Sequence, residues 1–393
     1  MIESCDVTDE ALLAGQERDV LECIAMKSHA RFTIGWLSLM LSGLLLLGCT
    51  SQNDPDLPTE SGATLPYDVI GFYPVRGTVN DLALVGQNLY AAEHSFGLTQ
   101  YDVSDPSNIT LQYHRETNQR PIFVEAAPWN NLLIAGFDDH LQGYMLDNSL
   151  TVNNIQPYTP CKNIVMFPDT STQSSEFDFE MHHTLGTRLL RFGEVEGMQI
   201  DYYYPDSSSS PPTSDYSFTK SLLDQLSLNP FGSGITSTVA VDSFFVVAVS
   251  LKDVGVGFIQ TNEEVRDGYN WLSDIDTPGE AFKIVYQDGF VFVADGNNGL
   301  AIINASDVNN PELVATWYED GVDHAVDIAV QGDYLVLMDQ YDGLYFFDIS
   351  NPIQPKYMGA SDFGDPTAMV FVDDGILIVT SSLKGMQALQ LLY

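Results

Sequence analysis

The sequence predicts an all-β chain whose main part, residues 67–393, folds as a single β-propeller. A glycine followed by an apolar residue recurs at intervals typical of propeller blades. Near-continuous apolar runs suit strands that are packed on both faces, as in stacked blades. No long stretch with helical periodicity competes with this interpretation.

The glycine motif occurs seven times along the chain. Its copies begin at Gly97, Gly143, Gly197, Gly255, Gly299, Gly343 and Gly385. The spacings are 46, 54, 58, 44, 44 and 42 residues, and the shorter ones match the length of four strands with their turns. We therefore expect seven four-stranded blades. Copy three, roughly residues 161–205, matches the motif poorly, so six or eight blades remain alternatives.

The sixth copy shows the four strands of one blade most clearly. The sequence predicts strands over Ala325–Val330, Tyr334–Met338, Gly343–Phe347 and Lys356–Gly359. Residues rich in Asp, Asn, Gly and Pro separate them, as tight turns require.

The two ends of the repeat region complement each other. The last copy stops at Tyr393 after its third strand, and Tyr67–Tyr73 looks like a lone fourth strand. If this strand completes the last blade, the ring closes and no sheet edge stays open. Residues 206–233, rich in Ser and Pro, are expected as an insertion between copies three and four.

Three copies carry a family resemblance. They read GLTQYDVSDP from Gly97, GLAIINASDV from Gly299 and GLYFFDISNP from Gly343. They resemble the LVIVD-repeat family, whose units read roughly Gly-Leu-x-Ile-x-Asp-Val-Ser-Asp-Pro. The resemblance is strong in copies one, five and six, and weak in two, three and four. It implies a propeller in an exported bacterial or archaeal protein, and it implies no catalytic residues.

The segment before the repeats predicts export. Residues 26–48 form a short basic head and an apolar run of 17 residues, too short for a membrane span. The run ends in Leu-Leu-Gly-Cys49, which resembles a lipoprotein signal peptide with lipidation of Cys49. Residues 1–25 are expected to be a mis-annotated extension. Residues 49–66 read as a lipidated flexible tether.

The resemblance to a lipoprotein implies a location and a partner. Thr50 follows the cysteine where Asp would favour retention in the inner membrane, so the outer membrane of a double-membraned bacterium is expected. The partner there is the membrane itself, through the lipid on Cys49. The chain is expected to be monomeric.

Charge and cysteine content exclude several classes. The chain has 54 acidic and 15 basic residues, a net charge of −39, so its field does not attract nucleic acid. Cys161 is the single cysteine after the tether, so the propeller has no internal disulfide.

Two kinds of side chain recur near the glycines that begin the seven copies, which we call the marker glycines. These side chains are candidates for a site. Acidic residues lie four positions before the glycine, and histidines lie in or near the same loops. The candidates are Glu93, Asp139, Asp295, Asp339, His94, His140 and His324. Carboxylates gathered at the ring's mouth could bind calcium or a cationic ligand. Turn chemistry is the alternative explanation for the acidic positions.

We expect a non-enzymatic, surface-tethered platform that binds an envelope protein or a glycan, with no cofactor. No catalytic motif accompanies the histidines. The alternatives are a polysaccharide-acting hydrolase or lyase that uses these acids and histidines, and a propeller with structural calcium only. A propeller fold by itself does not choose among them.

Overall fold

The computed structural model describes most of residues 65–393. The described ranges are 65–128, 131–138, 140–147, 149–151, 163–169, 173–175, 178–182, 186–193, 197–205, 214–221, 235–241, 246–251, 254–261, 269–319, 322 and 324–393. The predicted extension, signal peptide and Cys49 lie outside these residues, as does the tether up to residue 64. Asp139 also lies outside them.

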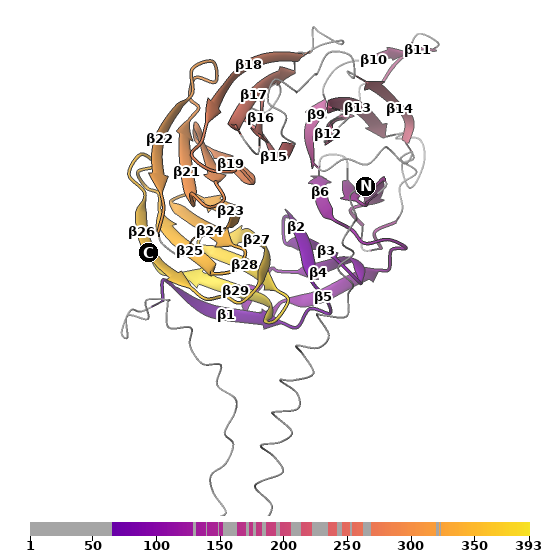
Figure 1. Cartoon of the computed structure of the whole chain (residues 1–393). Coiled ribbons are helices and arrows are strands. Elements are labelled where there is room, and N and C mark those ends of the chain that lie inside the picture. Colours follow the sequence, from indigo (N-terminus) through magenta and orange to yellow (C-terminus); the bar gives the residue numbers. More distant parts are fainter. Residues whose placement is uncertain are drawn as a thin grey trace, which may run out of the picture. The chain divides into compact units, whose positions relative to one another are not determined.

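Three antiparallel sheets come first along the chain (Figure 1). The first contains β2 (Val79–Val85), β3 (Asn88–Glu93), β4 (Gly97–Asp102) and β5 (Thr110–Arg115). The second contains β6 (Phe123–Ala127), β7 (Leu132–Gly136) and β8 (Leu141–Met145). The third contains β9 (Asn163–Asp169), β12 (Gly186–Gly193), β13 (Gly197–Pro205) and β14 (Ser214–Ser221), and β10 (Gln173–Ser175) pairs with β11 (Asp178–His182). A 3₁₀ turn, η2 (Pro106–Asn108), precedes β5.

Four further sheets follow with the same up-and-down order. The fourth contains β15 (Ile235–Ala240), β16 (Val246–Leu251), β17 (Gly255–Thr261) and β18 (Tyr269–Asp276). The fifth contains β19 (Lys283–Gln287), β20 (Phe290–Ala294), β21 (Leu300–Asn304) and β22 (Glu312–Trp317). The sixth contains β23 (Ala325–Gln331), β24 (Tyr334–Asp339), β25 (Gly343–Asp348) and β26 (Lys356–Ser361). The seventh contains β27 (Pro366–Asp373), β28 (Ile376–Ser381), β29 (Gly385–Leu391) and β1 (Tyr67–Tyr73).

The first strands of the sheets form a closed inner ring. Each one contacts its two neighbours, in the order β2, β6, β9, β15, β19, β23, β27 and back to β2. This arrangement is a β-propeller, which confirms the predicted fold class. The blade prediction needs one correction, because six sheets have four strands and the second has three described strands.

The ring closes where the sequence predicts. Strand β1 pairs antiparallel with β29, from Tyr67 opposite Leu391 to Tyr73 opposite Met386. The Tyr67 hydroxyl lies 2.6 Å from the hydroxyl of Ser361 in the sixth sheet. The outer edge of β29 is therefore covered by a strand from the other end of the repeat region.

Apolar side chains between neighbouring sheets form the core. The second and third strands of the sixth sheet are buried along nearly their whole length. Phe346 packs with Leu377 and Val379 of the seventh sheet, and Phe347 packs with Ile302 of the fifth. Burial on both faces explains why these strands read as continuous apolar runs instead of alternating ones.

The marker glycines begin the third strands and have a steric reason to be glycine. Gly97, Gly255 and Gly343 have φ of 107°, 122° and 105°, a region that side chains disfavour. A Cβ atom on Gly343 would also collide with the backbone oxygen of Ser361 on the neighbouring strand. The repeat motif thus records a close approach of backbones in the first, fourth and sixth blades, and Gly299 and Gly385 meet backbone oxygens in the same way in the fifth and seventh.

Two blades differ from the sequence prediction, and the second blade differs in its strand register. In the second sheet the amide of Phe137 bonds to the carbonyl of His140, as Asp295 does with Gly299 in the fifth. His140 therefore holds the position of the marker glycine, and Gly143 lies inside β8. The cause is the loop between β7 and β8, which is one residue shorter than the equivalent loop of the fifth blade.

The third blade includes a segment that the sequence analysis placed in the insertion. Residues 214–221 form β14, the outer strand of that sheet, which pairs with β13. Residues 206–213 and 222–233 of the insertion lie outside the described residues.

Candidate functional site

The predicted acidic residues and histidines lie at one end of the blades. In an up-and-down sheet, the loops between second and third strands lie at the same end as the connections to the next blade. Backbone bonds join the two kinds of segment: the amide of His94 donates to the carbonyl of Thr78, and Gln340 donates to His324. We call this side of the ring the loop face.

Asp339 is buried and fully engaged by backbone amides. Its Oδ2 accepts from the amide of His324 at 2.7 Å. Its Oδ1 accepts from the amides of Tyr341 and Asp342 at 2.8 and 3.1 Å. The carboxylate therefore fixes its own loop and ties that loop to the connection from the fifth blade.

Asp295 has the same role in the fifth blade. It is buried, and it accepts from the hydroxyl of Thr277 at 2.7 Å and from the amide of Gly279 at 2.8 Å. Ser381 replaces the acid in the seventh blade, where its hydroxyl accepts from the amides of Leu383 and Lys384. Asp339 and Ser381 therefore perform turn chemistry, whereas Asp295 anchors the preceding connection, and cation binding at these positions stays a prediction.

Glu93 has a different partner. It is buried, and its Oε1 accepts from the hydroxyl of Tyr101 at 2.6 Å. Burial, together with the Glu93 carboxylate, raises the pKa of Tyr101. Glu93 and Tyr101 line a cavity of about 20 Å³ with Thr99 and His114, which has room for about one water.

The three candidate histidines occupy different positions. His94 is the first loop residue after β3, whereas His140 stands where the marker glycine stands in other blades. His324 lies in the connection before β23, with its ring 4.8 Å from Phe282 and 6.0 Å from Tyr341. They come from three different blades and do not form one catalytic group.

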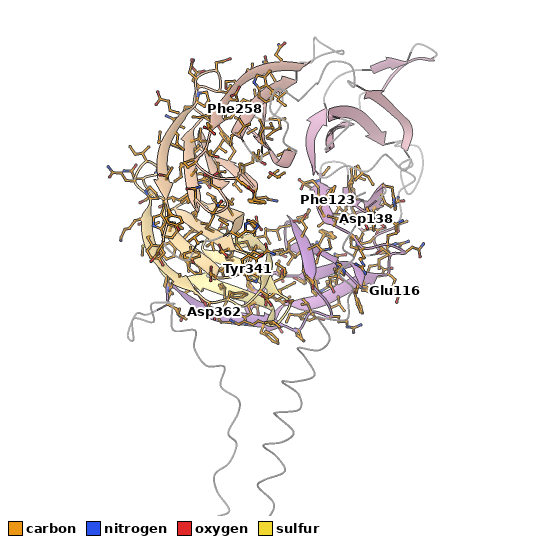
Figure 2. All side chains as sticks on the ribbon, in the orientation of Figure 1. Glu116, Phe123, Asp138, Phe258, Tyr341 and Asp362 are labelled. Atoms are coloured by element: carbon orange, nitrogen blue, oxygen red, sulfur yellow. The ribbon has the colours of Figure 1, made fainter. Side chains whose placement is uncertain are left out.

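A larger pocket opens between the first and second blades. Its volume is about 310 Å³, within the size range of small-molecule sites. The lining residues are Arg115, Glu116, Thr117, Asn118, Gln119, Phe137, His140, Gln142 and Tyr144. Figure 2 labels Glu116, which belongs to this lining, and Asp138, which follows Phe137 in the loop. The pocket lies at the loop face, because it includes the connection after β5 and the loop after β7.

Ring contacts fix the two ends of this pocket. The Arg115 guanidinium lies 5.7 Å from the centre of the Tyr144 ring, a cation–π contact. The rings of Phe137 and His140 are stacked, with centres 4.8 Å apart and an angle of 11°. Among the predicted site residues that the structure describes, His140 is therefore the one that lines a pocket of ligand size.

A charged cluster lines the inner ring. Lys283 on β19 interacts electrostatically with Asp327 on β23, Asp81 on β2 and Glu125 on β6. These strands belong to the fifth, sixth, first and second blades, and all four lie on the inner ring (Figure 1). We call these four residues the channel cluster.

Burial and neighbouring charges shift the pKa values of the channel cluster. Burial raises the pKa of Glu125 to about 7 and that of Asp327 to about 6, against the opposing effect of Lys283. Burial alone would lower the pKa of Lys283, but the surrounding carboxylates outweigh it and raise that pKa. The inner strands surround Glu125, yet its side chain is exposed to solvent. Solvent therefore screens part of its interaction with the neighbouring charges.

Sequence reasoning missed the channel cluster and most of the pocket. Glu125 and Lys283 belong to no shared motif, whereas Asp81 in Asp-Leu-Ala-Leu and Asp327 in Asp-Ile-Ala-Val hold the same position on their first strands. Arg115 to Gln119 follow a strand end and resemble an ordinary connection. One sequence signal was available. A charged side chain on an inner strand is expected to face the central channel, because the space between blades is apolar.

Among the described residues, no group of three or more His, Cys, Asp and Glu side chains is arranged to hold a metal ion. Within the same part of the chain, no helix has the length and apolar character needed to cross a membrane.

Comparison with known proteins supports the repeat assignment. Three stretches match the LVIVD repeat family, at residues 76–117, 278–318 and 323–362. They coincide with the first, fifth and sixth blades, the copies in which the resemblance is strongest. Together they cover less than half of the chain. No curated protein matches the sequence.

Solved structures share the architecture at low sequence identity. The computationally designed Ika8 protein has a TM-score of 0.55 and 10% identity, over 82% of this chain and 99% of its own. The RRP9 WD40 repeats have a TM-score of 0.55 and 8% identity, over 84% and 98%. Raptor of Chaetomium thermophilum has a TM-score of 0.54 and 10% identity, over 82% of this chain and 29% of its own. At these identities the likeness shows the fold alone. The chain is a β-propeller protein that contains LVIVD repeats.

Proposed function

We propose that this protein is a non-enzymatic binding platform, tethered through a lipid on Cys49 to an envelope membrane. Its ligand is an envelope protein or a glycan, taken on the loop face. The observation that supports this proposal most is the pocket of about 310 Å³ between the first and second blades. The pocket combines charged, amide and aromatic side chains, as small-ligand sites do.

The geometry of the acids and histidines favours binding over catalysis. Glu93 and His114 share one cavity, but its volume of about 20 Å³ admits a water and no sugar ring. Asp295 and Asp339 are buried and hold protein amides. A general acid or base must reach its substrate, and neither aspartate has an open path to one.

The tether is tested separately from the ligand. Cys49→Ala in the full chain removes the acceptor for the lipid, so we expect the protein to leave the membrane fraction. The measurement is fractionation, with detection through a tag after Tyr393 and metabolic labelling with palmitate. A Cys49→Ala protein that stays in the membrane fraction would overturn the lipid tether.

The platform is tested by crosslinking in intact cells. We expect a reproducible envelope ligand, protein or glycan, on the wild-type protein. The combined variant Arg115→Ala and His140→Ala should lose it, whereas Lys356→Ala should keep it. Lys356 begins β26 and is exposed at the opposite end of the blades. Equal recovery by all three proteins would exclude the pocket as the binding site and contradict the proposal.

A further inference from the structure

The pocket between the first two blades has polar groups suited to hydroxyls. Three amide side chains, those of Asn118, Gln119 and Gln142, belong to its lining. An amide offers donors and an acceptor in one plane, and the guanidinium of Arg115 adds a fixed fork of donors. Neighbouring hydroxyls on a sugar ring can pair with both kinds of planar group.

Among the described residues that line the pocket, the fixed charges balance. Arg115 contributes one positive charge and Glu116 one negative charge. A ligand with a net charge would bring a like charge near one of these two groups, which lowers the affinity. The balance therefore favours a neutral ligand over an acidic or basic one.

Part of the lining is held in position before a ligand arrives. Arg115 ends β5 and lies against the Tyr144 ring, and His140 stacks on Phe137. Phe137 and Tyr144 are buried, so their rings cannot swing away. A preformed site loses less conformational freedom on binding, which suits a weakly hydrophobic ligand such as a sugar.

We infer that this pocket binds a short segment of a neutral, hydroxyl-rich glycan. The inference deepens the proposed function and rests on it. Arg115, Asn118 and Gln142 hold the hydroxyls, and Glu116 accepts from one of them. The pocket's volume of about 310 Å³ suits such a segment better than a folded partner.

The test is binding of the full-length, lipidated protein in detergent to defined oligosaccharides. The probes are neutral oligomers of glucose, galactose and N-acetylglucosamine, and uronic-acid oligomers of the same lengths. Gln142→Ala is matched with Gln112→Ala, which changes an exposed glutamine of β5 outside the pocket. Arg115→Ala is matched with Arg120→Ala, an exposed arginine outside the pocket.

We expect a neutral oligomer to bind and each pocket variant to weaken it by about tenfold, the usual effect of losing one polar contact. The matched controls should bind as the wild type. Affinity should change little when the Debye length is shortened from about 10 Å to about 3 Å with salt, because no net charge is neutralised. Asn118→Ala, at an exposed position, is the variant least able to disturb folding.

Other results would overturn the inference in distinguishable ways. Binding of uronic-acid oligomers alone, weakened by salt, would replace the neutral ligand with an acidic one and leave the platform intact. No oligosaccharide binding, with a pocket-dependent protein crosslinked in cells, would overturn the glycan and keep the platform. Failure of both experiments would remove the proposed function itself.

Discussion

The backbone amide of His324 donates a 2.7 Å hydrogen bond to the buried carboxylate of Asp339. This bond joins the connection that enters the sixth blade to the loop between β24 and β25. The same carboxylate also holds the amides of Tyr341 and Asp342. One side chain therefore organises two segments of the loop face.

Asp339→Ala should lower the free energy of unfolding by about 2–4 kcal/mol, because three amides lose a charged acceptor. Asp348→Ala is the control, since Asp348 accepts from the amide of Ser350 in an exposed turn, and it should cost less than about 1 kcal/mol. Urea denaturation measures both. Equal losses would contradict the role of burial.

Gly343→Ala should destabilise the sixth blade by about 1–3 kcal/mol, the usual cost of backbone strain. Gly343 has a φ of 105°, and an added Cβ meets the carbonyl oxygen of Ser361. Gly332→Ala is the matched control, because Gly332 also has positive φ, 56°, but faces open space. If thermal unfolding shows the same Tm loss for both, the close approach contributes nothing.

Removal of β1 should open the ring. A protein that begins at Pro74 lacks the strand that covers β29, so we expect a lower Tm and concentration-dependent aggregation through the bare edge. A protein that begins at Leu65 keeps β1 and should behave as the complete repeat region. Light scattering during heating distinguishes the two, and a monomeric, equally stable short protein would refute closure as a stabilising contact.

The channel cluster should make stability depend on pH. The raised pKa values of Glu125, about 7, and Asp327, about 6, mean that the folded state holds these protons more tightly than the unfolded state. Their contribution to stability is therefore present at low pH and is lost as pH rises from about 4.5 to about 7. Glu125→Gln should flatten that decline, as measured by urea denaturation across this range. Parallel curves for the two proteins would exclude Glu125 as the source.

Lys283→Met should destabilise the protein more at about pH 8 than at about pH 5. At the higher pH Glu125 and Asp327 are ionised beside Lys283, because their pKa values are about 7 and about 6. We expect a loss of about 1–3 kcal/mol, below the value for fully buried pairs because the channel is partly wet. A loss that does not depend on pH would indicate packing by the lysine stem as its cause.

The sequence alone determined the propeller class, the strands of the sixth blade and the closure by residues 67–73. The propeller class and the sixth blade follow from causes that act within one blade, because a glycine at positive φ, an aspartate in a turn and an apolar run recur with the repeat. The closure follows from a lone strand at one end of the repeat region that matches a missing strand at the other. The three strongest copies are therefore recognisable from their residues alone.

Tertiary structure decided which side chains meet. Asp81 and Lys283 are far apart in the sequence, and they interact because the inner strands share one channel. The shorter loop that puts His140 in place of the marker glycine appears only in the strand register. The pocket likewise needs a connection and a loop from different blades. Closing the ring sets these distances, and no short-range pattern in the sequence encodes them.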